Sequence, residues 1–185
     1  ALPNILQAVD QALAMGFAVK INAVLLKGIN DGELGAFLDY VKDRPVSVRW
    51  IELMPTDQGA DYFKKYHVKS DALKSLLLSS GWTPRERKEG DGPALELEHP
   101  DFLGRVGIIA PYAKDFCSTC NRLRVTAHGA LRLCLFGESN SSLRHLLQAP
   151  EQKKELKGYI QALLTKKEVS HYLPEGRYGN NATFS

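Results

Sequence analysis

The sequence predicts an α/β protein, with the last units of an incomplete parallel barrel followed by an α+β part that contains an antiparallel sheet. Apolar residues recur at helical spacing over residues 4–15 and 31–42. Each of these segments is followed by the pattern of a buried strand, over 17–26 and 46–53. Helices that alternate with strands are typical of a parallel layer. Two such units cannot close a barrel, so we expect its other strands to come from elsewhere.

After Met54 the pattern changes to shorter elements. A loop is expected to lead into a helix around 70–80, and Ser142 is expected to cap a short helix. An amphipathic helix is predicted over 151–166. Short strands are predicted, in chain order, near 82–88, 93–98 and 104–110.

The composition excludes several classes of protein. With 44% hydrophobic and 24% charged residues, the chain is expected to fold rather than to be disordered. A net charge of +3 is too small to indicate nucleic-acid binding. No apolar run approaches the roughly 20 residues that span a bilayer. Three cysteines cannot complete a disulfide framework, so they favour metal ligation in a reducing cytoplasm.

The three cysteines lie close together in the sequence. Cys117 and Cys120 belong to the run DFCSTCNRLR, and Cys134 follows with the spacing C-x2-C-x13-C. Alternating residues predict strands over 122–125 and 131–135, with a tight turn between them. Closing this hairpin would set Cys134 opposite Arg122 or its neighbours, beside Cys120. One hairpin is therefore predicted to gather all three sulfurs.

Three thiolates favour an iron–sulfur cluster with one open iron over structural zinc, which normally has four protein ligands. Two alternatives remain open: zinc with a histidine as fourth ligand, or three unrelated buried thiols. The histidines lack ligand spacing and are interpreted as structural, including the one in the hairpin turn; they are His67, His99, His128, His145 and His171.

Two arginines stand beside the cysteines. Arg122 and Arg124 are separated by one residue, so on a strand they point to one face, while Leu123 and Val125 point to the other. Paired guanidiniums next to an open metal site form an anion-binding surface. A solvated strand face is the simpler interpretation of a lone arginine, and it is less attractive for two beside a metal site.

These motifs resemble a known family. The run DFCSTCNRLRVTAHGALRLCLFGE is similar to the C-terminal cluster motif of GTP 3′,8-cyclase (molybdenum cofactor biosynthesis protein A), a family of radical S-adenosylmethionine enzymes. The resemblance begins at VKIN, over 19–22, and continues through VRWIELM, over 48–54. The family's N-terminal C-x3-C-x2-C motif and its final Gly-Gly are not in this sequence. We therefore expect the chain to be the C-terminal part of a longer enzyme, with barrel units over 1–55 and the cofactor-synthesis C-terminal domain over 56–185.

The resemblance also implies roles for individual residues. The three cysteines would bind the second 4Fe–4S cluster, whose open iron would take the guanine base. Arg122, the backbone of Leu123, Arg124 and Lys20 would position GTP. Without the family, Lys20 is more simply a charge at a strand edge or in a salt bridge. Met54 would contact S-adenosylmethionine, and Arg49 would bind anionic groups on that side.

In the family, an N-terminal 4Fe–4S cluster cleaves S-adenosylmethionine to a 5′-deoxyadenosyl radical. This radical takes the ribose 3′-hydrogen of GTP, and the ribose carbon then attacks C8 of guanine. The resemblance implies as partners GTP, S-adenosylmethionine, the missing N-terminal half, the downstream cyclic pyranopterin monophosphate synthase and a second copy in a homodimer. It implies neither nucleic acid nor a membrane. The alternative is a non-catalytic domain, stabilised by zinc or a cluster, that binds a nucleotide or a protein.

Overall fold

The computed structural model describes residues 2–55, 59–88, 90–113, 116, 117, 120, 122–134 and 141–167. The described residues belong to two compact units. The first unit comprises 1–54 and 61–110, and the second comprises 55–60 and 111–185. This division differs from the predicted one at 55/56, because the strand at 105–109 pairs with the strand at 47–52 and residues 61–110 belong to the first unit.

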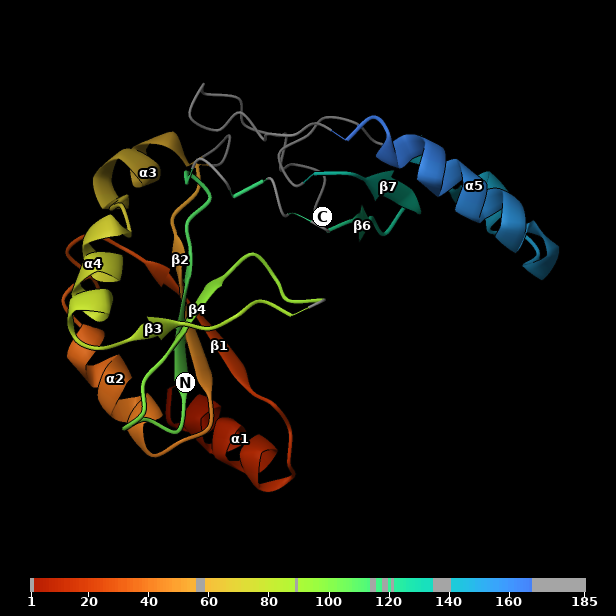
Figure 1. Ribbon diagram of the computed structural model, residues 1–185. Helices are drawn as coiled ribbons and strands as arrows, with labels where there is room; N and C mark the ends of the chain where they lie inside the picture. Colours follow the sequence, from red (N-terminus) through yellow and green to blue (C-terminus); the bar gives the residue numbers. More distant parts are fainter. Residues whose placement is uncertain are drawn as a thin grey trace. The chain divides into compact units, whose positions relative to one another are not determined.

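The first unit alternates helices and strands before it turns to shorter strands (Figure 1). The predicted helix–strand–helix–strand order at its start is confirmed. In chain order its elements are α1 (Leu2–Ala14), β1 (Lys20–Leu25), α2 (Leu34–Lys42), β2 (Ser47–Glu52), α3 (Ala60–Tyr66), α4 (Asp71–Ser79), β3 (Thr83–Pro84), β4 (Leu95–Glu98) and β5 (Arg105–Ile109).

These strands form one mixed sheet of five, in the order β1-β2-β5-β4-β3. β1, β2 and β5 are parallel, whereas β4 and β3 continue the sheet antiparallel. The parallel layer predicted for the first two strands is therefore present, and β5 extends it. The sequence placed the strand near 104–110 in the second part. Its pairing with β2 corrects that assignment.

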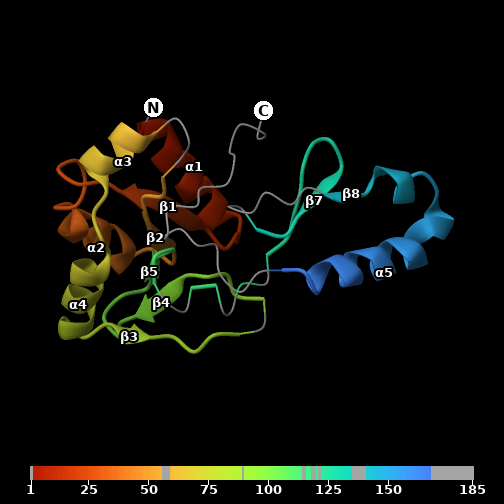
Figure 2. The same ribbon diagram turned by 90° about the horizontal axis from the view of Figure 1, so that it is seen from above.

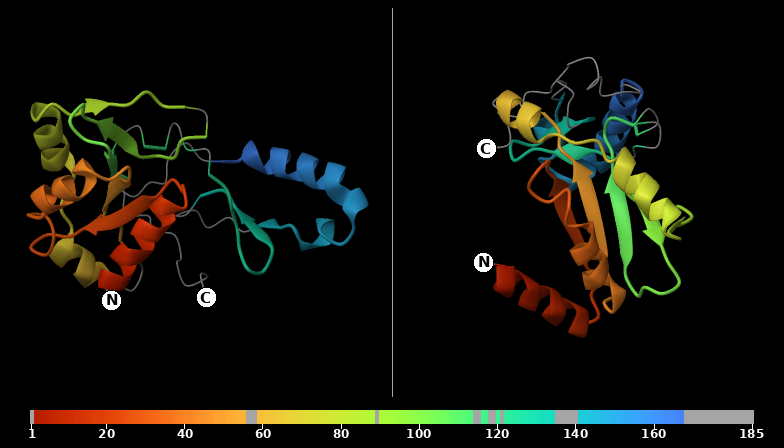
Figure 3. Two further views of the ribbon diagram at one scale, coloured as in Figure 1. Left: turned by 90° about the horizontal axis from the view of Figure 1, so that it is seen from below. Right: turned by 90° about the vertical axis from the view of Figure 1, so that its left-hand side faces the viewer.

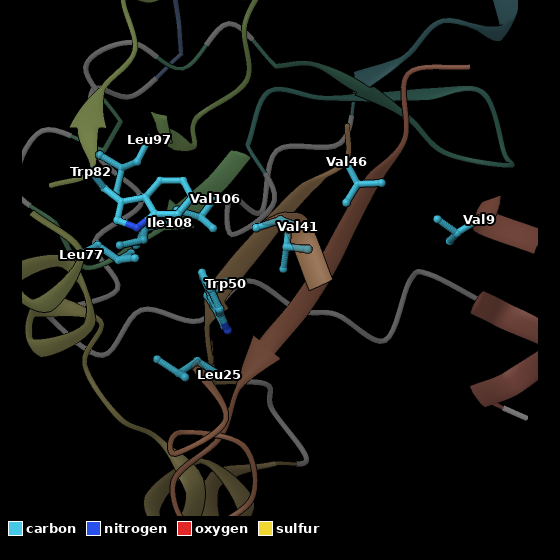
Figure 4. Close-up of a cluster of buried hydrophobic side chains, with 11 residues drawn as sticks. Val9, Leu25, Val41, Val46, Trp50, Leu77, Trp82, Leu97, Val106 and Ile108 are labelled. Carbon is cyan, nitrogen blue, oxygen red and sulfur yellow. The ribbon is translucent and has the colours of Figure 1, made fainter. Parts of the chain in front are cut away.

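One face of this sheet is apolar and is covered by helices. Val48 pairs with Val106 and Trp50 with Ile108, so these side chains share a face. Val41 of α2 and Leu77 of α4 belong to the same buried cluster, and the ring of Phe37 meets Trp50 edge-on at 5.4 Å. Figure 4 shows the cluster around Trp50. The opposite face carries Lys20, Asn22, Ser47, Arg49 and Glu96.

The second unit is built on a small antiparallel sheet, in the order β6-β7-β8. Leu163 of the last helix packs against Leu131, Leu133 and Leu143, so the helix is fixed on the sheet by apolar burial. Figures 2 and 3 show this helix and the small sheet in further views. The elements are β6 (Arg124–Val125), β7 (Ala130–Arg132), β8 (Ser141–Ser142), the 3-10 helices η1 (Arg144–Leu146) and η2 (Pro150–Gln152), and α5 (Lys153–Leu164).

Two local predictions need correction. The loop expected after Met54 contains the helix α3, in which the ring of Tyr62 contacts that of Tyr66 one turn later. The short helix expected after Ser142 is present as the 3-10 helix η1, and Ser142 Oγ accepts a hydrogen bond from Arg144 N over 3.4 Å. Leu143 is the residue at the N-cap position, because Ser142 itself pairs with Ala130 as part of β8. Within the described ranges, no helix combines the length and the apolar character needed to cross a membrane.

Candidate functional site

Cys117 and Cys120 are held together by a tight turn of the backbone. The amide of Cys120 donates a hydrogen bond to the carbonyl of Cys117 over 3.1 Å, and Phe116 donates to Ala113 over 3.0 Å. Cys117, Cys120 and Cys134 are each half-buried. The turn presents two thiols from residues close in sequence, as a shared metal centre requires.

The predicted hairpin is present, but its paired region is short. Arg124 pairs with Arg132 and Val125 with Leu131. The amide of Thr126 donates to Ala130 and that of Gly129 to Thr126, both over 2.9 Å, and Gly129 has a φ of 71°. The strands are therefore shorter than the predicted 122–125 and 131–135, of which residue 135 lies outside the described residues. Extending the register would set Cys134 opposite Arg122, two residues beyond the ladder.

The cysteines fit an iron–sulfur cluster by the chemistry of their donors. Three thiols are the soft ligands that such clusters and zinc take in proteins. The described residues include all three cysteines, but among them no three or more histidine, cysteine, aspartate or glutamate side chains are gathered as a group that could hold a metal ion. The thiols therefore match the expected cofactor in kind and in order along the hairpin, while a gathered three-sulfur site stays a prediction.

The arginines next to the cysteines concentrate positive charge. Arg122 is exposed and Arg124, the first residue of β6, is half-buried. Leu123 lies between them with 38% of its surface exposed. Arg124 lies directly opposite Arg132 in the ladder, and Arg132 is only 3% exposed. Directly opposed side chains share a face of the sheet, so Arg124 and Arg132 lie on one face. Sequence reasoning missed Arg132, because only the register pairs it with Arg124.

In the first unit, Lys20 and Arg49 lie on the polar face of the sheet. Lys20 pairs with Ser47 and Asn22 with Arg49, so Lys20 and Arg49 are diagonal neighbours. This face is opposite to the one that buries Val48 and Trp50. Lys20 and Arg49, two candidate binding residues that are far apart in sequence, thus lie on adjacent strands and on one face of the sheet.

Arg49 already has an acidic partner on that face. Glu96 of β4 forms an ion pair with Arg49 and accepts a hydrogen bond from Ser47 Oγ over 2.9 Å. Gly107 of β5 lies between the two strands, and a Cβ there would be 3.0 Å from Arg49 Cγ. Glycine therefore leaves the space across which Arg49 and Glu96 meet. Glu96 is a second residue that the sequence did not single out.

Lys20 also acts electrostatically on a nearby loop. The pKa of Asp91 is lowered mainly by the amide of Lys88, then by the guanidinium of Arg85, and further by the Lys20 ammonium. Arg85 and Asp91 form an ion pair with 2.6 Å between Nη2 and Oδ2. The loop between β3 and β4 thus carries its own paired charges, at Arg85 and Asp91.

The carboxyl end of β2 is fixed by a buried carboxylate. Glu52 is 3% exposed and accepts hydrogen bonds from Ser70 Oγ over 3.1 Å and from Ser70 N over 3.5 Å. His67 Nε2 lies 3.0 Å from Glu52 Oε1, so its interpretation as a structural histidine agrees with this contact. Met54 follows two residues beyond the strand and is half-buried. Glu52, to which the sequence assigned no role, ties the connection between α3 and α4 to the segment that leads to Met54.

Each compact unit thus gathers part of the predicted site. The first holds Lys20 and Arg49 on one sheet face and Met54 beyond the end of β2. The second holds the cysteine turn and the segment from Arg122 to Arg124. That all of them serve one bound nucleotide stays a prediction.

Comparison with known proteins agrees with these features. Residues 46–173 match the family model described as Molybdenum Cofactor Synthesis C. The chain is 47% identical over 177 residues to a GTP 3′,8-cyclase of Yersinia pestis. This alignment covers 95% of this chain and 54% of that protein. It is 50% identical over 179 residues to a GTP 3′,8-cyclase of Stenotrophomonas maltophilia, covering 96% of this chain and 55% of the relative.

The chain spans about half the length of the curated relatives that it matches. The family model covers most of the chain, including β2, β5, the cysteine turn and α5. The chain therefore belongs to the Molybdenum Cofactor Synthesis C family.

Proposed function

We propose that this chain is the nucleotide-holding part of a GTP 3′,8-cyclase and acts in molybdenum cofactor biosynthesis in the cytoplasm. The observation that carries the proposal is the cysteine turn followed at once by the segment Arg122–Arg124, in a chain of this family. The relatives named GTP 3′,8-cyclase, at 44–50% identity, support it. In this proposal β1, β2 and β5 are the last strands of an incomplete barrel.

Cys117, Cys120 and Cys134 would hold a 4Fe–4S cluster by their thiolates. When bound, such a cluster with three cysteines supplies an open iron position that can take a nitrogen or oxygen of the guanine base. Arg122 and Arg124 would bind the anionic part of GTP, because guanidiniums match phosphate oxygens in charge and geometry. The amide of Leu123 would add a donor between them.

Lys20 and Arg49 would approach GTP and S-adenosylmethionine from the polar face of the first unit. Both are cations on adjacent strands, and Glu96 holds the Arg49 side chain in place. Met54 would offer a soft apolar contact to S-adenosylmethionine. A radical takes the nearest hydrogen, so this part of the enzyme would decide the product by fixing the position of GTP.

The test is anaerobic reconstitution of the chain with ferrous iron and sulfide, followed by calorimetric titration with GTP. We expect a brown protein that absorbs near about 400 nm, holds iron and sulfide, and binds GTP only when the cluster is present. ATP at the same concentration is the matched control for recognition of guanine.

Two results would contradict the proposal. A colourless protein with stoichiometric zinc and no iron would favour the alternative of a zinc-stabilised binding domain. A loaded cluster without any difference between GTP and ATP would remove the proposed role in holding the guanine base.

A further inference from the structure

Lys167 lies beside the cysteine turn, although it is 47 residues from Cys120 in the sequence. Its ammonium donates a hydrogen bond to the carbonyl of Cys120 over 2.8 Å and to the carbonyl of Arg122 over 3.1 Å. The same Nζ lies 3.8 Å from Cys120 Sγ, within the distance of a hydrogen bond to sulfur. One side chain therefore contacts the backbone on both sides of residue 121 and a sulfur.

The position of Lys167 is set by the last helix. The amide of Lys167 donates to the carbonyl of Leu164 over 3.1 Å, which continues the turn at the end of α5. α5 is fixed on the small sheet by Leu163, which packs with Leu131 and Leu133. The helix that covers the hairpin thus also delivers an ammonium to the cysteine segment, and the half-buried side chain is partly shielded from solvent.

The chemistry of an ammonium suits this place. It has three donors and no acceptor, so it can serve two carbonyls and a sulfur at once. Three thiolates around an iron–sulfur cluster add negative charge, which a nearby cation stabilises. Outer groups that donate to ligand sulfurs are known to orient the ligands and to set the reduction potential.

We propose that Lys167 is a positioning residue of the sulfur site: it fixes the backbone from Cys120 to Arg122 and places a positive charge against the Cys120 sulfur. This inference rests on the proposed function in one respect, that the cysteines hold a cluster. It adds a residue outside the cysteine motif, and it links the metal ligand Cys120 to the nucleotide-binding residue Arg122 through one side chain.

The experiment compares Lys167→Met with Lys167→Arg and with the matched control Lys166→Met. Met keeps an unbranched side chain as far as Cε and removes the ammonium, Arg keeps a charged donor, and Lys166 is an exposed neighbour. The reconstituted proteins are treated with an iron chelator, and cluster absorbance is followed with time. We expect Lys167→Met to weaken iron retention about 10- to 100-fold, Lys167→Arg to restore most of it, and Lys166→Met to match the unsubstituted chain.

Two further measurements separate this role from simple stabilisation of the fold. The reduction potential of the cluster should become more negative in Lys167→Met, because the reduced cluster loses a stabilising cation, and should stay unchanged in Lys166→Met. In the cluster-free proteins, the amides of residues 122–124 should exchange hydrogen faster in Lys167→Met. If Lys167→Met fails to fold, Lys167→Gln, which keeps a donor without the charge, takes its place.

Equal iron retention and equal potentials in Lys167→Met and Lys166→Met would overturn the inference and leave the proposed function intact, provided that the unsubstituted chain holds its cluster. An unsubstituted chain that takes up no iron and sulfide would overturn the proposed function and, with it, the role of Lys167 at a cluster.

Discussion

Each cysteine of the hairpin is expected to be indispensable as a ligand, because the chain contains only three. Cys117→Ser, Cys120→Ser and Cys134→Ser should each lose the cluster, since a serine hydroxyl is a poorer iron ligand than a thiolate. Iron and sulfide analysis after anaerobic reconstitution checks this. Val125→Thr, a change at an exposed position on the same hairpin, is the control. Full iron in one serine variant would remove that cysteine from the ligand set.

The two arginines should affect the nucleotide and not the metal. Arg122→Ala or Arg124→Ala should weaken GTP binding by about 1.5–3 kcal/mol, roughly ten- to a hundred-fold, through loss of a charge-assisted hydrogen bond. Titration of the reconstituted protein measures this, with iron content as a parallel readout. Arg144→Ala, an exposed arginine on η1, is the control. The assignment fails if both variants bind GTP as the unsubstituted chain does.

At the scale of residues, the sequence revealed what lies close together along the chain. Cys117, Cys120, Arg122 and Arg124 occupy one short run, so spacing alone suggested their chemistry. The contacts of Glu96 with Ser47 and of Lys167 with Cys120 join residues 49 and 47 positions apart. No local pattern predicts such contacts, because they depend on strand order and on the docking of α5.

Among the elements, the turn before β5 has the least room for a side chain. A Cβ on Gly104 would lie 2.5 Å from the carbonyl oxygen of Arg44 and 2.6 Å from that of Val46. The Gly104 amide donates to Val41, at the end of α2, so the backbone cannot easily move away. We expect Gly104→Ala to lower the free energy of unfolding of the first unit by about 1–3 kcal/mol, as measured by urea unfolding.

Gly35 in α2 provides the matched control, because a Cβ added there would have no atom within 4 Å apart from its chain neighbours and the backbone of its own helix. Gly35→Ala should stabilise the same unit by about 0.4–1 kcal/mol, since alanine loses less backbone entropy in a helix. Equal unfolding midpoints for the two variants would show that the close approach at Gly104 does not limit the packing of β5.

The helices and strands with a sustained apolar periodicity were predicted well. The strands that are defined by pairing with another strand were not. α1, α2, β1, β2 and α5 follow their apolar periodicity. The sequence indicated β5 as a strand but not its partner, because its apolar residues suit either sheet and only the pairing with β2 decides. β8 is two residues long and is defined by its pairing with β7, so the signal at Ser142 indicated the helix η1 that follows but not the strand.

For the molecule as a whole, we expect the chain alone to leave S-adenosylmethionine intact. Its three cysteines are all assigned to the proposed cluster beside the hairpin, so none remains for the separate cluster that cleaves S-adenosylmethionine in the family. The assay measures 5′-deoxyadenosine under reducing, anaerobic conditions with S-adenosylmethionine and GTP. A full-length relative is the positive control. If the chain alone cleaved S-adenosylmethionine at the rate of that enzyme, the expectation that cleavage needs a further cluster would be refuted.

We also expect the chain to self-associate through its first elements. Large apolar side chains are exposed there, including Leu2 at 64%, Ile5 at 58% and Phe17 at 59%. Exposed apolar groups in one region favour association. Sedimentation velocity should show concentration-dependent species, and Ile5→Lys together with Phe17→Lys should reduce them. Purely monomeric sedimentation of the unsubstituted chain at high concentration would contradict this expectation.

The two edges of the five-stranded sheet are unlike each other. The outer strand β3 is two residues long and includes Pro84, which has no amide hydrogen to donate, so this edge resists further pairing. β1 is six residues long and pairs only with β2 in the sheet. If two copies joined β1 to β1, each copy would use the sheet edge that can accept a further strand. The edge left at the outside of the pair would be β3, which resists pairing. Growth through this sheet would then end at a pair with twofold symmetry, and it would not propagate into a fibre.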